Sequence, residues 1–371
     1  MLRRAILPVL AFALVLTACS DSVSSDTTGD GSSETTSVEG SSQTVEDVLA
    51  EVEGLSVEER RARLVELAQS EDNELVLYGS AVAQTIDALA QAFMEDTGVD
   101  VLTYRAASED LVTRVLREGE AGQLDADVVW LGDAQLLSFE EAELLAPFTS
   151  PYQENLVEGS VAEHWTVNSY QVYTVDWNTD LVAEGEQPQS YQDLADPKWD
   201  DQMVMTPGDS DWYWMISNYL REEGFTEEDL DQYWTDVTTG SDFSDGHTTT
   251  RQFLIAGEYA VYTSDFTQGA EVAKADGAPI EWKPAISPLI ATPEAAAIFE
   301  STPRPATSVL FMDWMINEGQ EVIRNELLFD VTREDLLQFD ESVELRFIDP
   351  QEWAAVQDEM TEEFAAYIPT S

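Results

Sequence analysis

The stretch Leu75-Val76-Leu77-Tyr78-Gly79-Ser80 is the clearest strand-and-turn pattern in the chain. Its apolar run predicts a buried strand, and Gly79-Ser80 predicts the turn that follows. Between Ile86 and Phe93, apolar residues then recur at i, i+3, i+4 and i+7 before the segment stops at Gly98. That spacing predicts an amphipathic helix, so the stretch opens a strand–turn–helix unit.

The same unit recurs along the chain. A second strand is expected over 99–104 and a third over 126–131, each followed by a small or polar turn and a helical pattern. After about residue 169 the pattern of apolar and polar residues changes, and further strands are expected over 170–175, 203–205 and 259–262. Strands that alternate with amphipathic helices predict parallel sheets covered on both faces. We therefore expect an α/β fold with two parallel or mixed sheets, arranged as two lobes with a ligand cleft between them.

The expected organisation has five parts, read from composition and pattern. A helix over 57–68, with Ser56 as its N-cap, is expected to precede the first strand. The parts are a signal segment 1–19, a flexible linker 20–45, a first lobe 46–168 that includes this helix, a second lobe 169–284, and a segment 285–371 that returns to the first lobe and ends in C-terminal helices.

The N-terminus has the pattern of an export signal. Two arginines precede an apolar run over 5–16, which is too short to span a membrane. Leu16-Thr17-Ala18-Cys19 resembles the lipobox of bacterial lipoproteins, in which the cysteine is lipidated and starts the mature chain. The alternative is an ordinary signal peptide with an incidental cysteine. Residues 20–45 are rich in Ser, Thr, Gly and acidic residues, which favours a flexible tether above a membrane.

Charge and cysteine content exclude several classes of function. The formal net charge is -57, from 74 acidic and 17 basic residues, and such a field repels nucleic acid and anionic lipid surfaces. This excess of negative charge suits a protein adapted to a salty medium, and equally an acidic secreted protein from an ordinary habitat. Cys19 is the single cysteine, which excludes a disulfide framework and a cysteine-based zinc cluster. His164 and His247 lie in no catalytic motif and are expected to be structural or exposed.

Small and polar residues gather at the turns after the predicted strands. In open α/β sheets, ligands bind beyond the carboxyl ends of the strands, where helix N-termini offer free N–H groups to anions. Any single serine at such a turn can equally serve only as a helix cap.

We also expect Trp212 to contact the ligand, while Trp130 and Trp214 are either ligand contacts or core residues. The predicted ligand site comprises Gly79, Ser80, Ser108, Gly132 and Asp133 from the first lobe, and Gly208, Asp209, Ser210, Trp212, Thr248, Ser264 and Asp265 from the second.

Four groups of segments carry a family resemblance between about Leu75 and Arg324. In their order and spacing they resemble the iron(III)-type family of ABC-importer solute-binding proteins: 75–80 with 98–101; 125–130; 187–199; and 256–258 with 276–280, 303–305 and 311–320. The resemblance implies two lobes joined by crossing strands, closure on a ligand, and delivery to an ABC permease. It implies a transport protein without a cofactor.

The resemblance also bears on the ligand. Iron binders of this family use two adjacent tyrosines just past the strand that corresponds to 259–262, and some use a histidine after the first strand. Here Asp265 and Phe266 occupy the tyrosine positions, and residues 79–82 contain no histidine. Asp133 and Asp265 remain as oxygen ligands if a metal is bound at all. The family is similar to binders of phosphate esters, phosphonates and organic cations, and we expect an anion or a polar ligand with an anionic end. An enzyme on the same fold and a structural surface protein are the alternatives.

Overall fold

The computed structural model describes residues 43–81, 83–337 and 343–369. The signal segment with Cys19, and the linker up to residue 42, lie outside the described residues. The first helix, α1 (Val45–Val52), begins within the stretch expected to be linker, because Thr44 caps it and Val45 is buried. Among the described residues, no helix is both long enough and apolar enough to span a bilayer.

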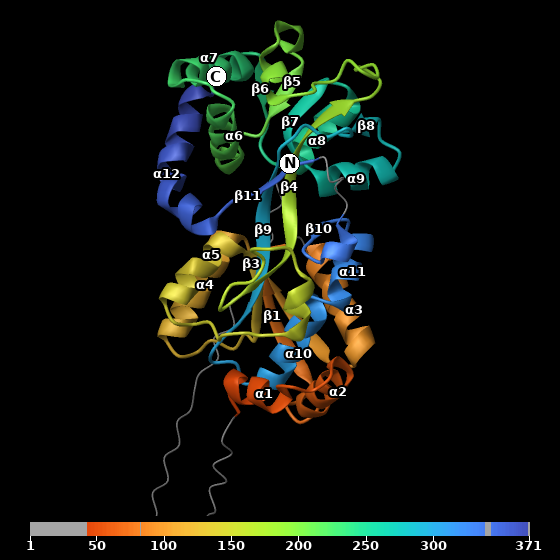
Figure 1. Ribbon diagram of the computed structural model, residues 1–371, viewed down its shortest axis with the longest axis vertical. Coiled ribbons are helices and arrows are strands. Elements are labelled where there is room, and N and C mark those ends of the chain that lie inside the picture. Colours follow the sequence, from red (N-terminus) through yellow and green to blue (C-terminus); the bar gives the residue numbers. More distant parts are fainter. Residues whose placement is uncertain (1–42, 82, 338–342, 370–371) are drawn as a thin grey trace, which may run out of the picture. The chain divides into compact units, whose positions relative to one another are not determined.

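We call lobe 1 the elements around the first predicted strand (Figure 1). It consists of α1, α2 (Val57–Ala68), β1 (Glu74–Gly79), α3 (Ala83–Thr97), β2 (Asp100–Arg105), α4 (Ser108–Glu120), β3 (Val128–Gly132), α5 (Asp133–Glu141), the 3-10 helix Pro151–Asn155, α10 (Pro305–Met315), α11 (Glu318–Asn325), β10 (Asp330–Val331) and the 3-10 helix Glu334–Leu336. Strand β1 pairs in parallel with both β2 and β3. The sheet is covered on both faces, since Val128 and Trp130 of β3 join one apolar cluster, and Val129 and Leu131 join another.

Lobe 2 is built around a second parallel set of strands. It consists of the 3-10 helices Tyr191–Ala195 and Pro197–Trp199, β5 (Met203–Met205), α6 (Ser210–Glu222), α7 (Glu227–Thr239), β6 (Ser241–Phe243), α8 (His247–Ala256), β7 (Val261–Phe266), α9 (Thr267–Ala275) and β8 (Ile280–Glu281). Strand β5 pairs in parallel with β6 and β7. The mixed α/β fold with two lobes is therefore as the sequence predicts.

Two long strands join the lobes. They are β4 (Thr166–Asn178) and β9 (Leu289–Ile298), which pair antiparallel with each other. Strand β9 also pairs with β3 of lobe 1, and β4 pairs with β7 of lobe 2, so the two sheets share one hydrogen-bonded path in the order β2-β1-β3-β9-β4-β7-β5-β6. Figure 1 shows β4 and β9 running from one group of helices to the other.

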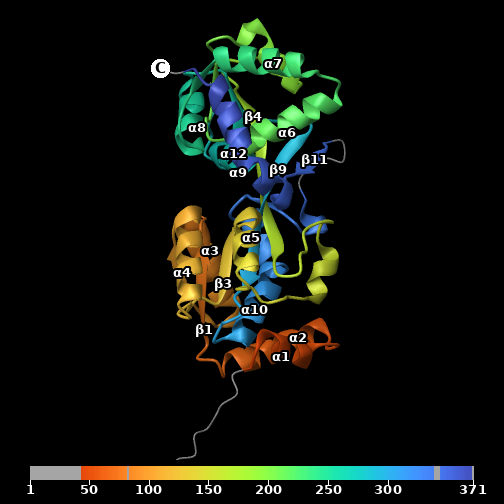
Figure 2. The ribbon, with the colours of Figure 1, turned by 90° about the vertical axis from the view of Figure 1, so that its left-hand side faces the viewer.

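The C-terminal segment is not confined to lobe 1. Strand β11 (Leu345–Phe347) pairs with β9, and α12 (Pro350–Tyr367) follows it. Tyr213 of α6 stacks on Phe364 of α12 at 4.9 Å between ring centroids, and its hydroxyl donates to Glu363. Helix α12 also contacts α5 of lobe 1, and Figure 2 shows it beside α6.

Several predicted boundaries shift by a few residues. Ser108 is the first residue of α4 rather than its cap, and Ala107 occupies the N-cap position. Thr248 lies inside α8, because that helix already begins at His247. Ser264 and Asp265 belong to β7 instead of following it, and both are fully buried.

Candidate ligand cavity

A cavity of about 420 Å³ is lined by residues from both lobes and from the two joining strands. This volume is within the range of small-molecule sites. Its walls comprise Ser80, Ala81, Thr85, Ser108 and Trp130; Gln171 and Glu294; Gly246, His247, Thr248, Thr249, Arg251, Phe266 and Gln268; and Phe329. A larger hollow of about 570 Å³ is lined only by residues of lobe 1 and its loops, and Arg333 there is already paired with Glu321 and Asp335. The cavity lined by both lobes is therefore the candidate site.

Helix N-termini from both lobes border the cavity. Ser80 and Ala81 precede α3, Ser108 opens α4, and Gly246 precedes α8. Gly246 has a φ of +80°, a conformation that favours glycine, and α8 begins directly after it. The N–H groups of a first helical turn have no partner within the helix and carry partial positive charge. The arrangement suits a ligand with an anionic group.

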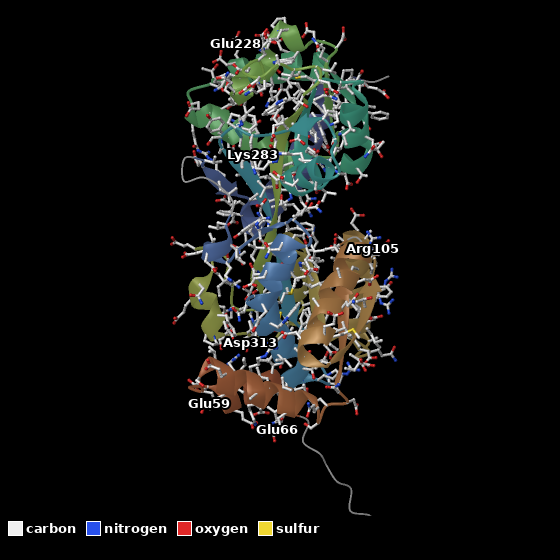
Figure 3. The ribbon with its side chains drawn as sticks, turned by 90° about the vertical axis from the view of Figure 1, so that its right-hand side faces the viewer. Glu59, Glu66, Arg105, Glu228, Lys283 and Asp313 are labelled. Atoms are coloured by element: carbon white, nitrogen blue, oxygen red, sulfur yellow. The ribbon has the colours of Figure 1, made fainter. Side chains whose placement is uncertain are left out.

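A side chain at the end of β2 forms hydrogen bonds to the turn that follows β1. Arg105, labelled in Figure 3, ends β2 and donates from Nε to the carbonyl oxygen of Ala81 at 3.2 Å. Its Nη2 lies 3.5 Å from the carbonyl oxygen of Ser80. These bonds occupy carbonyl groups, so the Ser80 side chain stays available at the cavity wall.

Arg251 is the only lysine or arginine among the residues that line this cavity. Its Nε donates to Asp265 at 2.6 Å and its Nη2 donates to the other carboxylate oxygen at 2.5 Å. Asp265 is fully buried behind it, and Asp176 lies beside Asp265 without any exposed surface. Burial, followed by the charge of Asp265, raises the pKa of Asp176 well above its usual range. With Asp176 protonated, the cluster of these three side chains is neutral, and Arg251 is the member that lines the cavity.

His247 lies one helical turn before Arg251 on α8. Its Nδ1 lies 2.7 Å from the Tyr262 hydroxyl, its Nε2 lies 3.2 Å from Oδ1 of Asp209, and its ring packs on Phe266 at 4.2 Å between centroids. Burial lowers the pKa of His247, but the hydrogen bond and charge of Asp209, with the charge of Asp265, outweigh burial and raise it. The helix thus presents His247 to the cavity beside Arg251, with both ring nitrogens held by Tyr262 and Asp209.

The wall formed by the joining strands carries a carboxyl group. Gln171 of β4 donates from Nε2 to Oε1 of Glu294 on β9 at 2.6 Å. Burial raises the pKa of Glu294 to about 7, although the bond from Gln171 acts in the opposite direction. The cavity therefore joins a cationic wall on α8 to an acidic wall on β9.

The structure brings together part of the predicted site. Ser80, Ser108 and Thr248 line the cavity, and Gly79 adjoins Ser80 at the end of β1. Asp209 and Asp265 lie behind the wall, where they bind His247 and Arg251. These two carboxylates position cavity residues.

Other predicted residues lie elsewhere. Asp133, which follows Gly132, lines a separate cavity of about 220 Å³. Gly208 is not among the lining residues, and the Ser210 hydroxyl lies 3.0 Å from that of Thr361 on α12. The Ser264 side chain is fully buried.

Trp212, which the sequence led us to expect at the ligand, does not line this cavity. Its side chain has no exposed surface and packs edge-on against Tyr191 and Trp234, at 6.3 and 5.7 Å between centroids. The first turn of α6 directs this side chain into the lobe 2 core. Trp130 instead is among the residues that line the cavity, although only 2% of it is exposed.

The described residues do not offer the metal site considered from the sequence. Both oxygens of Asp265 bind Arg251, and Asp133 lines the other cavity. No group of three or more His, Cys, Asp or Glu side chains in the described part of the chain is arranged to hold a metal ion. The residues that line the cavity include no tyrosine.

Sequence reasoning missed Arg251, His247 and the pair Gln171–Glu294. Arg251 and His247 have a local signal, because their spacing of four places them on one helix face after Gly246. Gln171 and Glu294 are 123 residues apart and have no local signal.

Comparisons with known proteins agree with this architecture. The curated relative Fe(3+)-binding periplasmic protein from Serratia marcescens is 23% identical over 159 residues, which are 42% of this chain and 47% of the relative. The match thus spans under half of that relative's length. The crystal structure of iron-bound HitA from Pseudomonas aeruginosa has a TM-score of 0.63 at 19% identity, covering 78% of this chain and 99% of HitA. AfuA from Actinobacillus pleuropneumoniae, with fructose-6-phosphate bound, has a TM-score of 0.62 at 18% identity, covering 80% of this chain and 99% of AfuA. These structures share the two-lobed fold.

The family match covers more than half of the chain. The family model described as bacterial extracellular solute-binding protein matches residues 88–322, which include most of both lobes and all of β4 and β9. This chain belongs to the family of bacterial extracellular solute-binding proteins.

Proposed function

We propose that this protein is the lipid-anchored solute-binding component of an ABC importer, and that it captures an anion or a polar ligand with an anionic end. The ligand binds in the cavity of about 420 Å³, and the lobes close on it about β4 and β9. The closed form then delivers the ligand to a permease. Binding without turnover distinguishes this role from that of an enzyme.

The observation that carries the proposal is the position of Arg251 among helix N-termini. Its guanidinium and the first turns of α3, α4 and α8 border one cavity. Asp265 uses Nε and Nη2, which leaves Nη1 for a ligand oxygen. AfuA, with the same fold, holds fructose-6-phosphate, a phosphate ester. The fold is therefore compatible with an anionic ligand as well as with iron.

Mass spectrometry of the solute released from purified, denatured protein tests the ligand class. We expect an anionic small molecule in an amount near one per chain, and Arg251→Ala protein should release much less of it. Glu300→Gln, at an exposed position beyond β9, serves as the control and should retain it. A released solute without any anionic group contradicts the proposal.

Ferric citrate should not colour the protein. The cavity presents no tyrosine, so no tyrosinate-to-iron charge-transfer band should form in the visible spectrum. A solute that fits should instead change tryptophan emission through Trp130. A coloured ferric complex that persists in Arg251→Ala protein would favour iron as the natural ligand.

Cys19 is proposed to carry the lipid anchor. The arrangement of Arg3, the apolar run 5–16 and Cys19 supports cleavage before the cysteine. Intact mass should show a lipidated Cys19 at the N-terminus, and Cys19→Ala should move the protein from the membrane fraction to the medium. Equal release of wild type and variant contradicts the anchor.

A further inference from the structure

The carboxyl group of Glu294 has no cationic partner. Gln171 donates to Oε1, and among the described residues no cationic side chain contributes to the pKa shift of Glu294. The arginine of the same cavity is committed to Asp265. Burial without a counter-charge raises the pKa of Glu294 to about 7, and a cationic ligand group would supply the counter-charge that favours the ionised carboxylate.

Trp130 lies on the same face of the sheet as this carboxyl group. In the pairing of β3 with β9, Trp130 lies opposite Ala296 and Gly132 lies opposite Glu294. Since side chains two apart on a strand share a face, Trp130 and Glu294 are diagonal neighbours on one face of the sheet. Both line the cavity. Trp130 is only 2% exposed, so Glu294 is the member of this pair that is available to bind a cationic group.

The acidic and cationic walls stand at different levels along β4. Glu294 lies opposite Ser169, whereas Asp265, the partner of Arg251, lies opposite Thr174. Five residues of strand correspond to roughly 17 Å of backbone. The long side chains of Glu294 and Arg251 extend into the same cavity from these two levels.

From this arrangement we infer that the ligand is a zwitterion, whose ammonium group binds Glu294 and whose anionic group binds Arg251 and the start of α8. This inference rests on the proposed function and names its ligand class. A second consequence is selectivity. A simple anion leaves Glu294 unpaired, and a simple cation leaves Arg251 and the helix N-termini without a ligand. Only a molecule with both groups satisfies both walls.

Matched probes test the inference. The purified full-length protein is titrated with ω-aminoalkyl phosphates from ethyl to hexyl, each compared with the alkyl phosphate of the same length. At the chain length that fits, the aminoalkyl phosphate should bind about tenfold tighter, since a charge-assisted bond to Glu294 is added. Glu294→Gln keeps the size of the side chain and should remove this preference. Glu300→Gln removes a charge outside the cavity and should preserve it.

The outcomes separate the two claims. Equal binding of the two series at every length, or an unchanged preference in Glu294→Gln protein, overturns the zwitterion and leaves the anion proposal standing. Failure of every phosphate in both series to bind overturns both claims. A preference that is lost in Glu294→Gln and kept in Glu300→Gln, with weaker binding of both series to Arg251→Ala protein, supports the inference.

Discussion

Replacing Gly269 by alanine should lower the free energy of unfolding by about 3–5 kcal/mol, the cost of breaking a buried ion pair. Gly269 lies in α9, and a Cβ built on it would overlap with the guanidinium of Arg251. Arg251 would have to move away from Asp265, which is fully buried beside Asp176. The cost arises because the Asp265 carboxylate is left buried without its counter-charge.

A double-mutant cycle in urea isolates this cause. Arg251→Ala should cost a similar amount, and Gly269→Ala added to it should cost little more, because no guanidinium remains to be displaced. Gly208→Ala is the control, since its added Cβ would meet no atom within 4 Å. Additive losses in the double variant would show that Gly269 acts independently of Arg251.

Arg60→Met should also destabilise the protein by about 3–5 kcal/mol, since it leaves Asp313 buried and unpaired. Arg60 of α2 donates from Nε to Asp313 of α10 at 2.6 Å, from Nη2 to its other oxygen at 3.1 Å, and from Nη2 to the carbonyl oxygen of Thr149 at 3.2 Å. The two side chains are 7% and 6% exposed, so water does not replace the lost partner. Figure 3 labels Asp313 on α10, close to the α1–α2 pair that carries Glu59 and Glu66.

Two further variants, measured by thermal or urea unfolding, test whether the unpaired charge of Asp313 causes this loss of stability. Arg60→Met combined with Asp313→Leu should recover much of the loss, because an apolar pair removes the unpaired charge. Arg63→Met, on the same helix, should change stability little, since its pairs with Glu51 and Glu66 lie at the surface. A double variant no more stable than Arg60→Met would point to lost packing instead.

Local elements followed from the sequence because their causes are local. Ser56 caps α2 and the helix spans Val57–Ala68 as its pattern predicts, with the cap bonded to the N–H of Glu59. Apolar runs and turn residues likewise placed β1 and β3 to within two residues. Where the pattern was weaker, as at Ser264 and Asp265, a strand continued through residues expected to follow it.

Residue patterns along the chain were enough to predict the strand–helix alternation, hence the two-lobed α/β fold, and to select Ser80, Ser108 and Thr248, which line the cavity. Periodicity and turn chemistry act over a few residues and are readable in one dimension. Only the tertiary structure decided that Trp212 packs in a core, that Arg251 faces the cavity backed by Asp265, and that Glu294 joins the wall beside Gln171 and Trp130. These outcomes depend on which helix face packs inward and on strand register between segments over a hundred residues apart. Pairing energies between distant segments set that register, and no local pattern encodes them.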